Sequence, residues 1–336
     1  MNNNYNTFKE LYDVTLKIKE MEPWKYFWDM DLITIFLPDF EEPICCSIMG
    51  RGGQYFGIGV YPGSYSLYGL MKISEGQIPY HQAIRYNNNL RCTFGNRDEL
   101  TKDQYNLIKE LGFKFRGKNN WVYFESNAKG YIPTMLDEDE AQFMLEIFKN
   151  LYMAIKKYIE EDIEVDFENG ETLLRRYDEQ SKLWYTHRAP LLIPAMSGKS
   201  YVIQDELLIA RLKNKKYNNN RIEIDVIYLN TPIKDKKYAV PLLPQMSICT
   251  DIDQGMIVNQ NISTVEESNE KDEMMNMLIG YVEAYGRPKS VYVRDELMQS
   301  VLADICEKLN IDLVISNKML IVDDFVESFM HFGGMR

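Results

Sequence analysis

The sequence predicts a two-domain protein, in which an α+β domain with a small antiparallel sheet precedes an α/β domain with the element order βββαβαβα. Its 336 residues suit two domains, and 45% hydrophobic and 26% charged residues are typical of a globular chain. Short apolar runs broken by Pro and Gly give way, toward the C-terminus, to alternating strand-like and helix-like segments. We expect the first domain over residues 1–165, a connector over 166–220, and the second domain over 221–336.

The first domain opens with an amphipathic helix, because Thr7 and Glu10 have the spacing of a capping box. The stretches "DLITIFLPDF", "PICCSIMG" and "QYFGIGVYPG" follow as short strands separated by turns. These strands predict the small antiparallel sheet.

Two further helices complete the first domain. Thr101 and Gln104 form a second capping box, and Gly112 ends the helix that follows. Acidic "DEDE" (137–140) complements the N-terminal dipole of a longer helix. Its apolar stripe consists of Phe143, Ile147, Leu151, Ala154 and Tyr158.

The connector alternates acidic, aromatic and basic stretches without sustained periodicity, so we expect one or two strands and an exposed turn there. Within it, "SGKS" (197–200) resembles the end of a phosphate-binding loop. The full G-x-x-x-x-G-K-S pattern requires glycine where Ile193 stands, so we expect no nucleotide site.

The second domain has the clearest order. "RIEIDVIYL" (221–229) alternates as a strand, and residues 238–251 and 255–263 predict two more antiparallel strands. A helix over about 268–284 is followed by the strand "SVYV", a second helix, the strand "IDLVIS" and a last helix around 321–331. We expect residues 221–229 beside 290–294 in parallel, covered by crossover helices with Leu297, Val301 and Ile305 buried. Leu309 continues the four-residue steps of that helix.

Charge argues against non-specific nucleic-acid binding. The net charge is −12, and residues 221–336 hold 11 Lys and Arg against 19 Asp and Glu, which gives −8. No apolar run could span a bilayer, and the first residues lack the regions of a signal peptide. Five cysteines without C-x-x-C spacing indicate reduced, buried thiols. We therefore expect a cytoplasmic protein with no membrane partner.

The element order of the second domain resembles the ribonuclease H-like fold, and its local text resembles the catalytic cores of integrases and transposases. The matching stretches are "DIDQGMIV", "GRPKSVYVRDEL" and "NIDLVIS". The whole chain also resembles a bacterial family of uncharacterised two-domain proteins. That resemblance rests on "PWKYFWDMDL", "CCSIMGRGGQYFGIGVYPG", "FGNRDELTKDQYNLIKELGFKFRGKNNWVYFES", "KGYIPTMLDEDEAQF" and "GRPKSVYVRDEL". It implies no biochemical activity.

The ribonuclease H-like resemblance implies carboxylates that converge on one or two Mg²⁺ ions for phosphodiester cleavage. Asp225 matches the first-strand acid and Asp295 the acid after the fourth strand. Glu327 is the expected third acid on the last helix, where Asp323 and Asp324 are also in reach. The sequence "RDEL" departs from the D-N-G that usually follows the second acid.

Each acid also has a structural interpretation. Asp295 fits an N-cap of the following helix. Asp225 and Glu223 share one side of a strand and could face solvent. The acids of the last helix complement its dipole. The three histidines lack the spacing of a zinc site; they are His81, His187 and His331.

The sequence therefore favours a non-catalytic binding or regulatory protein that keeps this fold with an eroded site and needs no cofactor. The alternative is a Mg²⁺-dependent nuclease or related phosphoryl-transfer enzyme that uses Asp225, Asp295 and Glu327 as catalytic metal ligands. A shared cation would require the carboxyl groups of Asp225 and Asp295 within about 5 Å of each other and open to solvent. Neither the ligand nor the oligomeric state follows from the sequence.

Overall fold

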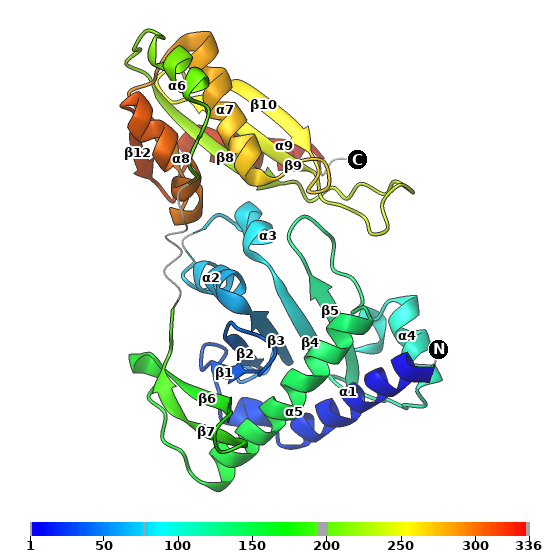
Figure 1. Ribbon diagram of the computed structural model, residues 1–336. Coiled ribbons are helices and arrows are strands. Elements are labelled where there is room, and N and C mark those ends of the chain that lie inside the picture. The colour runs from blue at the N-terminus through cyan, green and yellow to red at the C-terminus, as the bar shows by residue number, and fades with distance from the viewer. Residues whose placement is uncertain (1, 77, 194–200, 334–336) are drawn as a thin grey trace. The chain divides into compact units, whose positions relative to one another are not determined.

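A computed structural model describes residues 2–76, 78–193 and 201–333 of the protein (Figure 1). The "SGKS" segment lies outside these residues, and so does the side chain of His331. The chain divides into two compact units, each with its own sheet. The first unit comprises Met1–Leu70, Asn87–Ala128 and Pro133–Pro194; the second comprises Met71–Tyr86, Lys129–Ile132 and Ala195–Arg336.

The first unit contains a mixed sheet of seven strands in the order β5-β4-β3-β2-β1-β6-β7. The strands are β1 (Ile33–Phe36), β2 (Ile44–Met49), β3 (Gly57–Pro62), β4 (Asn89–Gly95), β5 (Trp121–Asn127), β6 (Glu171–Asp178) and β7 (Leu183–Pro190). Neighbouring strands are antiparallel except β1 and β6, which are parallel. The expected small antiparallel sheet is therefore wrong in size and direction, because β6 and β7 come from residues expected in the connector.

Two long helices, α1 (Asn2–Glu20) and α5 (Glu138–Glu160), pack side by side against this sheet and close its apolar core (Figure 1). The α5 stripe is confirmed: Ile147, Leu151 and Ala154 are buried, and Phe143 and Tyr158 pack against the same core. The other helical segments that begin in this unit are η1 (Pro23–Lys25), α2 (Gly63–Ser74), η3 (Arg97–Glu99), α4 (Lys102–Glu110) and η4 (Phe167–Asn169).

Two of the expected features at helix ends are present in the structure and one is not. The capping box of Thr101 and Gln104 is confirmed at α4, and Gly112 follows that helix with a positive φ of 83°. Asp137 forms a further capping box with Glu140 at α5. The box expected at Thr7 is wrong, because α1 begins at Asn2 and Thr7 lies inside it.

The second unit contains a five-stranded sheet in the order β10-β9-β8-β11-β12. Its strands are β8 (Arg221–Tyr228), β9 (Gln245–Asp251), β10 (Met256–Ser263), β11 (Ser290–Val293) and β12 (Asp312–Ile315). The helical segments are η2 (Tyr80–Gln82), α3 (Ala83–Tyr86), α6 (Glu206–Lys213), α7 (Glu270–Tyr285), α8 (Glu296–Leu309) and α9 (Leu320–Gly333). From β8 onward the element order is the expected βββαβαβα.

The strand directions also agree with the sequence. The parallel pairing of β8 with β11 is confirmed, β12 continues it in parallel, and β9 and β10 are antiparallel to their neighbours. Helix α8 buries Val301 and Ile305 as expected, and it also buries Leu309. Full burial of Leu297 is wrong, because this residue of the first turn is half-buried. No helix of the described ranges combines the length and apolar character that a bilayer crossing requires.

The two faces of this sheet are covered by different helices. Ile222, Ile224 and Val226 of β8 join a core that includes residues of α6, α7 and α8. Ile227 and neighbouring side chains of β9 pack against α9 in a second core. Because strand side chains alternate between faces, Glu223 and Asp225 point to the α9 face. That face carries the polar site described next.

Candidate functional site: carboxylates paired with arginines

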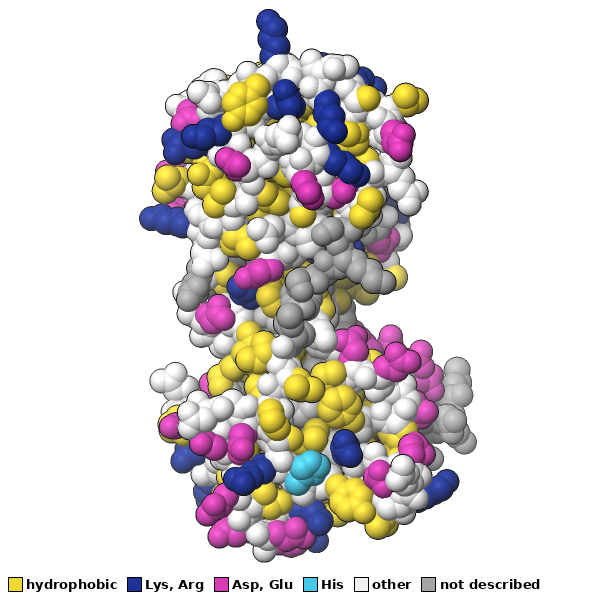
Figure 2. Space-filling model, turned by 60° about the vertical axis from the view of Figure 1, so that its left-hand side comes forward, with side chains coloured by type: hydrophobic (Ala, Val, Ile, Leu, Met, Phe, Trp, Pro, Cys, Tyr) yellow, Lys and Arg dark blue, Asp and Glu magenta, His cyan; other side chains and the backbone are white. Residues whose placement is uncertain are grey.

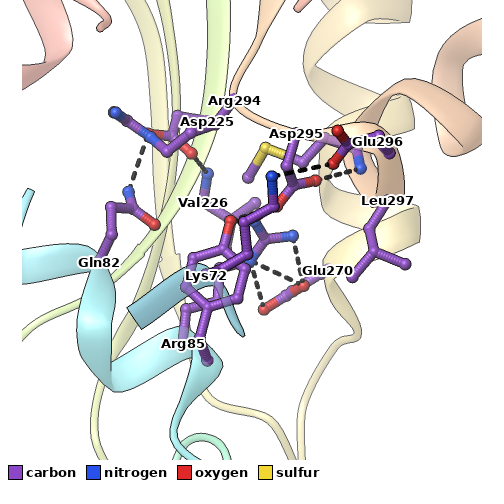
Figure 3. A network of polar contacts seen from close by, with 12 residues as sticks. Lys72, Gln82, Arg85, Asp225, Val226, Glu270, Arg294, Asp295, Glu296 and Leu297 are labelled. Carbon is purple, nitrogen blue, oxygen red and sulfur yellow. Dashed lines mark hydrogen bonds and ion pairs between the residues drawn. The ribbon is translucent and has the colours of Figure 1, made fainter. Parts of the chain in front are cut away.

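Asp225 lies in the middle of β8 and is completely buried, with 0% of its surface exposed. Its Oδ2 accepts hydrogen bonds from Nε of Arg294 at 2.9 Å, from Nη2 of the same arginine at 2.6 Å, and from Nε2 of Gln82 at 2.9 Å (Figure 3). Its Oδ1 accepts from the backbone amide of Val226 at 2.8 Å. A solvent-facing position is therefore wrong for Asp225, since α9 and residues 78–86 cover this face of the sheet.

Arg294 follows β11 and is also fully buried. Besides Asp225, its guanidinium contacts Asp323 Oδ1 at 2.8 Å and donates to the carbonyl of Asn317 at 2.9 Å. Burial acts against its charge, but Asp225 and then Asp323 outweigh that effect and raise the pKa of Arg294. One guanidinium thus joins a strand carboxylate to the first turns of α9.

His81 lies on a second side of Asp323, with its Nε2 3.4 Å from Asp323 Oδ1 but without hydrogen-bond geometry between the two atoms. Burial acts to raise the pKa of Asp323, but the contact with His81 and the charge of Arg294 outweigh it, so the pKa is lowered. Asp323 also accepts a hydrogen bond from the amide of Met319 at 3.0 Å. It therefore fixes the start of α9 while balancing the charge of Arg294.

Asp295 caps α8, as the sequence suggests: its Oδ1 accepts from the backbone amide of Met298 at 2.8 Å. Asp295 also contacts side chains outside α8. Its Oδ2 accepts from Nη1 of Arg85 at 3.0 Å (Figure 3). The same oxygen accepts from the hydroxyl of Tyr86, and 2% of Asp295 is exposed. Asp295 is thus both an N-cap and the partner of a second buried guanidinium.

Arg85 connects Asp295 with Glu270, the first residue of α7. Its Nη2 lies 3.1 Å from Glu270 Oε2, and its Nε contacts both carboxylate oxygens. Glu270 also accepts from the hydroxyl of Tyr228 at 2.9 Å and pairs with Lys129 at 3.4 Å. Burial acts to raise the pKa of Glu270, but Arg85 and Lys129 outweigh it and lower the pKa to about 2.

Glu223, two residues before Asp225, is 2% exposed and also lies on the α9 face. Its Oε2 accepts from the hydroxyl of Thr250 at 2.9 Å and from the amides of Ile321 and Val322 at 3.2 Å each. It thus satisfies two backbone donors at the N-terminus of α9. Burial raises its pKa despite these bonds.

Glu327, the third expected acid, is exposed on α9. It lines an open pocket of about 570 Å³ together with Asp323 and Asp324. The structure therefore places Glu327 one helical turn from Asp323, whose guanidinium partner also holds Asp225. Asp295 is held by a different arginine, Arg85.

As arranged, the carboxylates of Asp225 and Asp295 do not fit a metal centre. Every carboxylate oxygen of Asp225 and Asp295 accepts a hydrogen bond from the protein, and guanidinium cations occupy the positions beside them. Within the described ranges, no group of three or more His, Cys, Asp or Glu side chains is positioned to hold a metal ion. The catalytic roles of Asp225, Asp295 and Glu327 stay predictions.

Sequence reasoning missed the partners of these acids. Gln82, Arg85 and Tyr86 belong to a part of the sequence expected in the first domain, and they lie 143 to 210 positions from the acids that they contact. No local pattern connects residues so far apart. Arg294 carried a visible signal, because a charged residue between the apolar strand "SVYV" and the capping Asp295 has to find a partner.

Comparison with known families matches two different family profiles to the two parts of the chain. The chain belongs to the family described as Domain of unknown function (DUF7309), whose profile matches residues 8–175. Residues 208–330 match a second profile, described as Domain of unknown function (DUF6930). No curated protein and no solved structure shows a significant match to the chain.

Proposed function

We propose that this is a cytoplasmic, non-catalytic binding or regulatory protein whose C-terminal domain is a ribonuclease H-like domain with an eroded site. The element order βββαβαβα and the parallel pairing of β8 with β11 support the fold assignment. Buried thiols at all five cysteines, with no disulfide, support a reducing compartment.

One observation carries the non-catalytic assignment. Asp225 and Asp295 stand where metal-binding acids are expected, and each is neutralised by a buried guanidinium. A metal-dependent nuclease needs these oxygens for its cations. Arg294 and Arg85 supply the balancing charge instead, so the carboxylate oxygens are already occupied by the protein's own side chains.

Surface charge supports the same proposal. Acidic and basic side chains are interspersed over the face in Figure 2, and among the residues described there no continuous basic surface covers it. With a net charge of −12, non-specific binding to a phosphate backbone is disfavoured. The binding partner we expect is therefore a protein or a small molecule.

The test is a cleavage assay with labelled single-stranded DNA, duplex DNA, RNA and an RNA–DNA hybrid, in millimolar Mg²⁺ or Mn²⁺. The parent should cleave none of them faster than a matched preparation of Asp225→Asn/Asp295→Asn, which controls for contaminating nucleases. Metal-dependent cleavage by the parent that disappears in this variant and in Glu327→Gln would establish the nuclease alternative.

A further inference from the structure

Residues 78–86, called the latch segment below, present four side chains to the acids of the second unit. His81 contacts Asp323, and Gln82 donates to Asp225. One helical turn later, Arg85 and Tyr86 both contact Asp295. The positions i, i+1, i+4 and i+5 form one face of the short helical segments η2 and α3. This face is polar and matches a surface of carboxylates.

The latch segment has little helical stability of its own. Its helical portions span three and four residues, whereas isolated helices shorter than about 12 residues are marginal in water. The segment is therefore ordered by its contacts with the rest of the second unit. Most of the contacts described above are hydrogen bonds and ion pairs.

The apolar cores of the second unit also indicate that the latch segment is held mainly by polar contacts. Among the described residues, neither the core beneath α7 and α8 nor the core beneath α9 includes a residue of the latch segment. A buried ion pair gives little net stabilisation, because the cost of removing two charges from water offsets their attraction. Undocking rehydrates the guanidinium and the carboxylates together, so it costs far less than removing one partner alone.

We propose that the carboxylates of Asp295 and Glu270 form a guanidinium-binding site, filled by the chain's own Arg85, and that the latch segment docks there reversibly. Release exposes a site for an arginine-bearing segment of a partner protein. Arg85 itself shows the chemistry of this site, since its fork contacts Glu270 through Nε and Nη2 and Asp295 through Nη1. The latch does not depend on whether the domain is catalytic.

The experiment is chemical rescue followed by hydrogen exchange in the full chain. Arg85→Ala removes the side chain beyond Cβ, and N-ethylguanidinium has the shape and charge of the missing part. Amide exchange within residues 82–86 should rise at least about tenfold in Arg85→Ala, because local opening becomes easier. N-ethylguanidinium at about 10 mM, which is below denaturing levels, should restore at least about a third of the lost protection.

Controls separate this result from general destabilisation. Ethylammonium carries the same charge without the fork and should restore less than half as much protection. Arg85→Lys should show an intermediate rise in exchange. Arg91→Ala removes an arginine from an ion pair of the first unit and should leave residues 82–86 unchanged.

Three results would overturn the proposal. Unchanged exchange of residues 82–86 in Arg85→Ala would show that Arg85 does not hold the segment. An equal rise across the amides of β8 to β12 would show that these residues open with the whole unit and form no separate latch. Failure of N-ethylguanidinium to restore any protection would exclude the guanidinium site.

Discussion

Replacing Arg294 by methionine should be among the most damaging single substitutions in the second unit. Arg294 and Asp225 are both fully buried, so the substitution leaves Asp225 and Asp323 without their shared guanidinium. Removing one partner of a buried pair costs about 3–5 kcal/mol. Methionine fills much of the space of the lost side chain, so the cost comes mainly from uncompensated charge and from the unpaired carbonyl of Asn317.

Asp225→Asn should cost less, about 1–3 kcal/mol, because Arg294 keeps Asp323 and the asparagine oxygen still accepts hydrogen bonds. The double variant should cost less than the sum of the two single substitutions, since it leaves no charged residue at position 225. Arg221→Met is the matched control. Its pair with Asp253 is exposed, so it should cost about 1 kcal/mol or less.

The assay is urea unfolding with a separate signal for each unit. All four tryptophans lie in the first unit, so their fluorescence reports that unit alone. Labelling of the buried thiols of Cys249 and Cys306, detected by mass spectrometry, reports the second unit. A free energy for the second unit within about 0.5 kcal/mol of the parent in Arg294→Met would refute the structural role of the buried pair.

Three further predictions concern Asp295, Glu270 and the cysteines. Asp295→Asn should keep the cap of α8 but lose the charge opposite Arg85, so it should lower the free energy of unfolding in urea by about 1–3 kcal/mol. Asp295→Ala also loses the cap and should cost about 1 kcal/mol more. Equal stability of Asp295→Asn and the parent would show that Asp295 acts only as a cap. Arg85 and Lys129 outweigh burial and lower the pKa of Glu270 from 4.5 to about 2, so the stabilisation that its carboxylate contributes is present above pH 4.5 and is lost as pH falls toward 2. The stability difference between parent and Glu270→Gln should therefore shrink between pH 5 and 2, and a constant difference would contradict this. Burial raises the pKa of the Cys45 thiol to about 11 and that of Cys306 to about 12, so a thiol reagent at pH 8 should modify none of the five cysteines before unfolding; rapid labelling of any one would show that its site opens.

The sequence predicted the order of elements from β8 to α9 because the signals of these elements are local. Alternation in β8 and four-residue steps in α8 define elements without reference to distant residues. Connections between parallel strands of one sheet are right-handed, and this rule leaves few topologies for the strands of the second unit. The parallel pairing of β8 with β11 belongs to one of them.

The first unit was harder to predict for the same physical reason. The parallel pairing of Ile33 with Leu173 joins strands 140 positions apart, and no local pattern specifies it. Helix α2 was not predicted, because "GSYSLYGLMKIS" contains two glycines and three serines, which have low helix propensity.

The candidate site was predictable in its acids and not in their partners. Alternation showed that Glu223 and Asp225 share a face of β8, but it does not tell whether that face is covered. Here α9 and the latch segment cover it, which turns two presumed surface acids into buried ones. Long-range partners such as Arg85 can be identified only once the fold brings them together.

The most direct test of the central claim, that arginines and not metal ions balance these acids, is a melting comparison with and without millimolar Mg²⁺. We expect the melting temperature of the parent to be the same in both conditions, because its carboxylate oxygens are already bonded. A rise of several degrees with Mg²⁺ in the parent, absent in Asp225→Asn and in Asp295→Asn, would contradict the claim and assign these residues to a metal site.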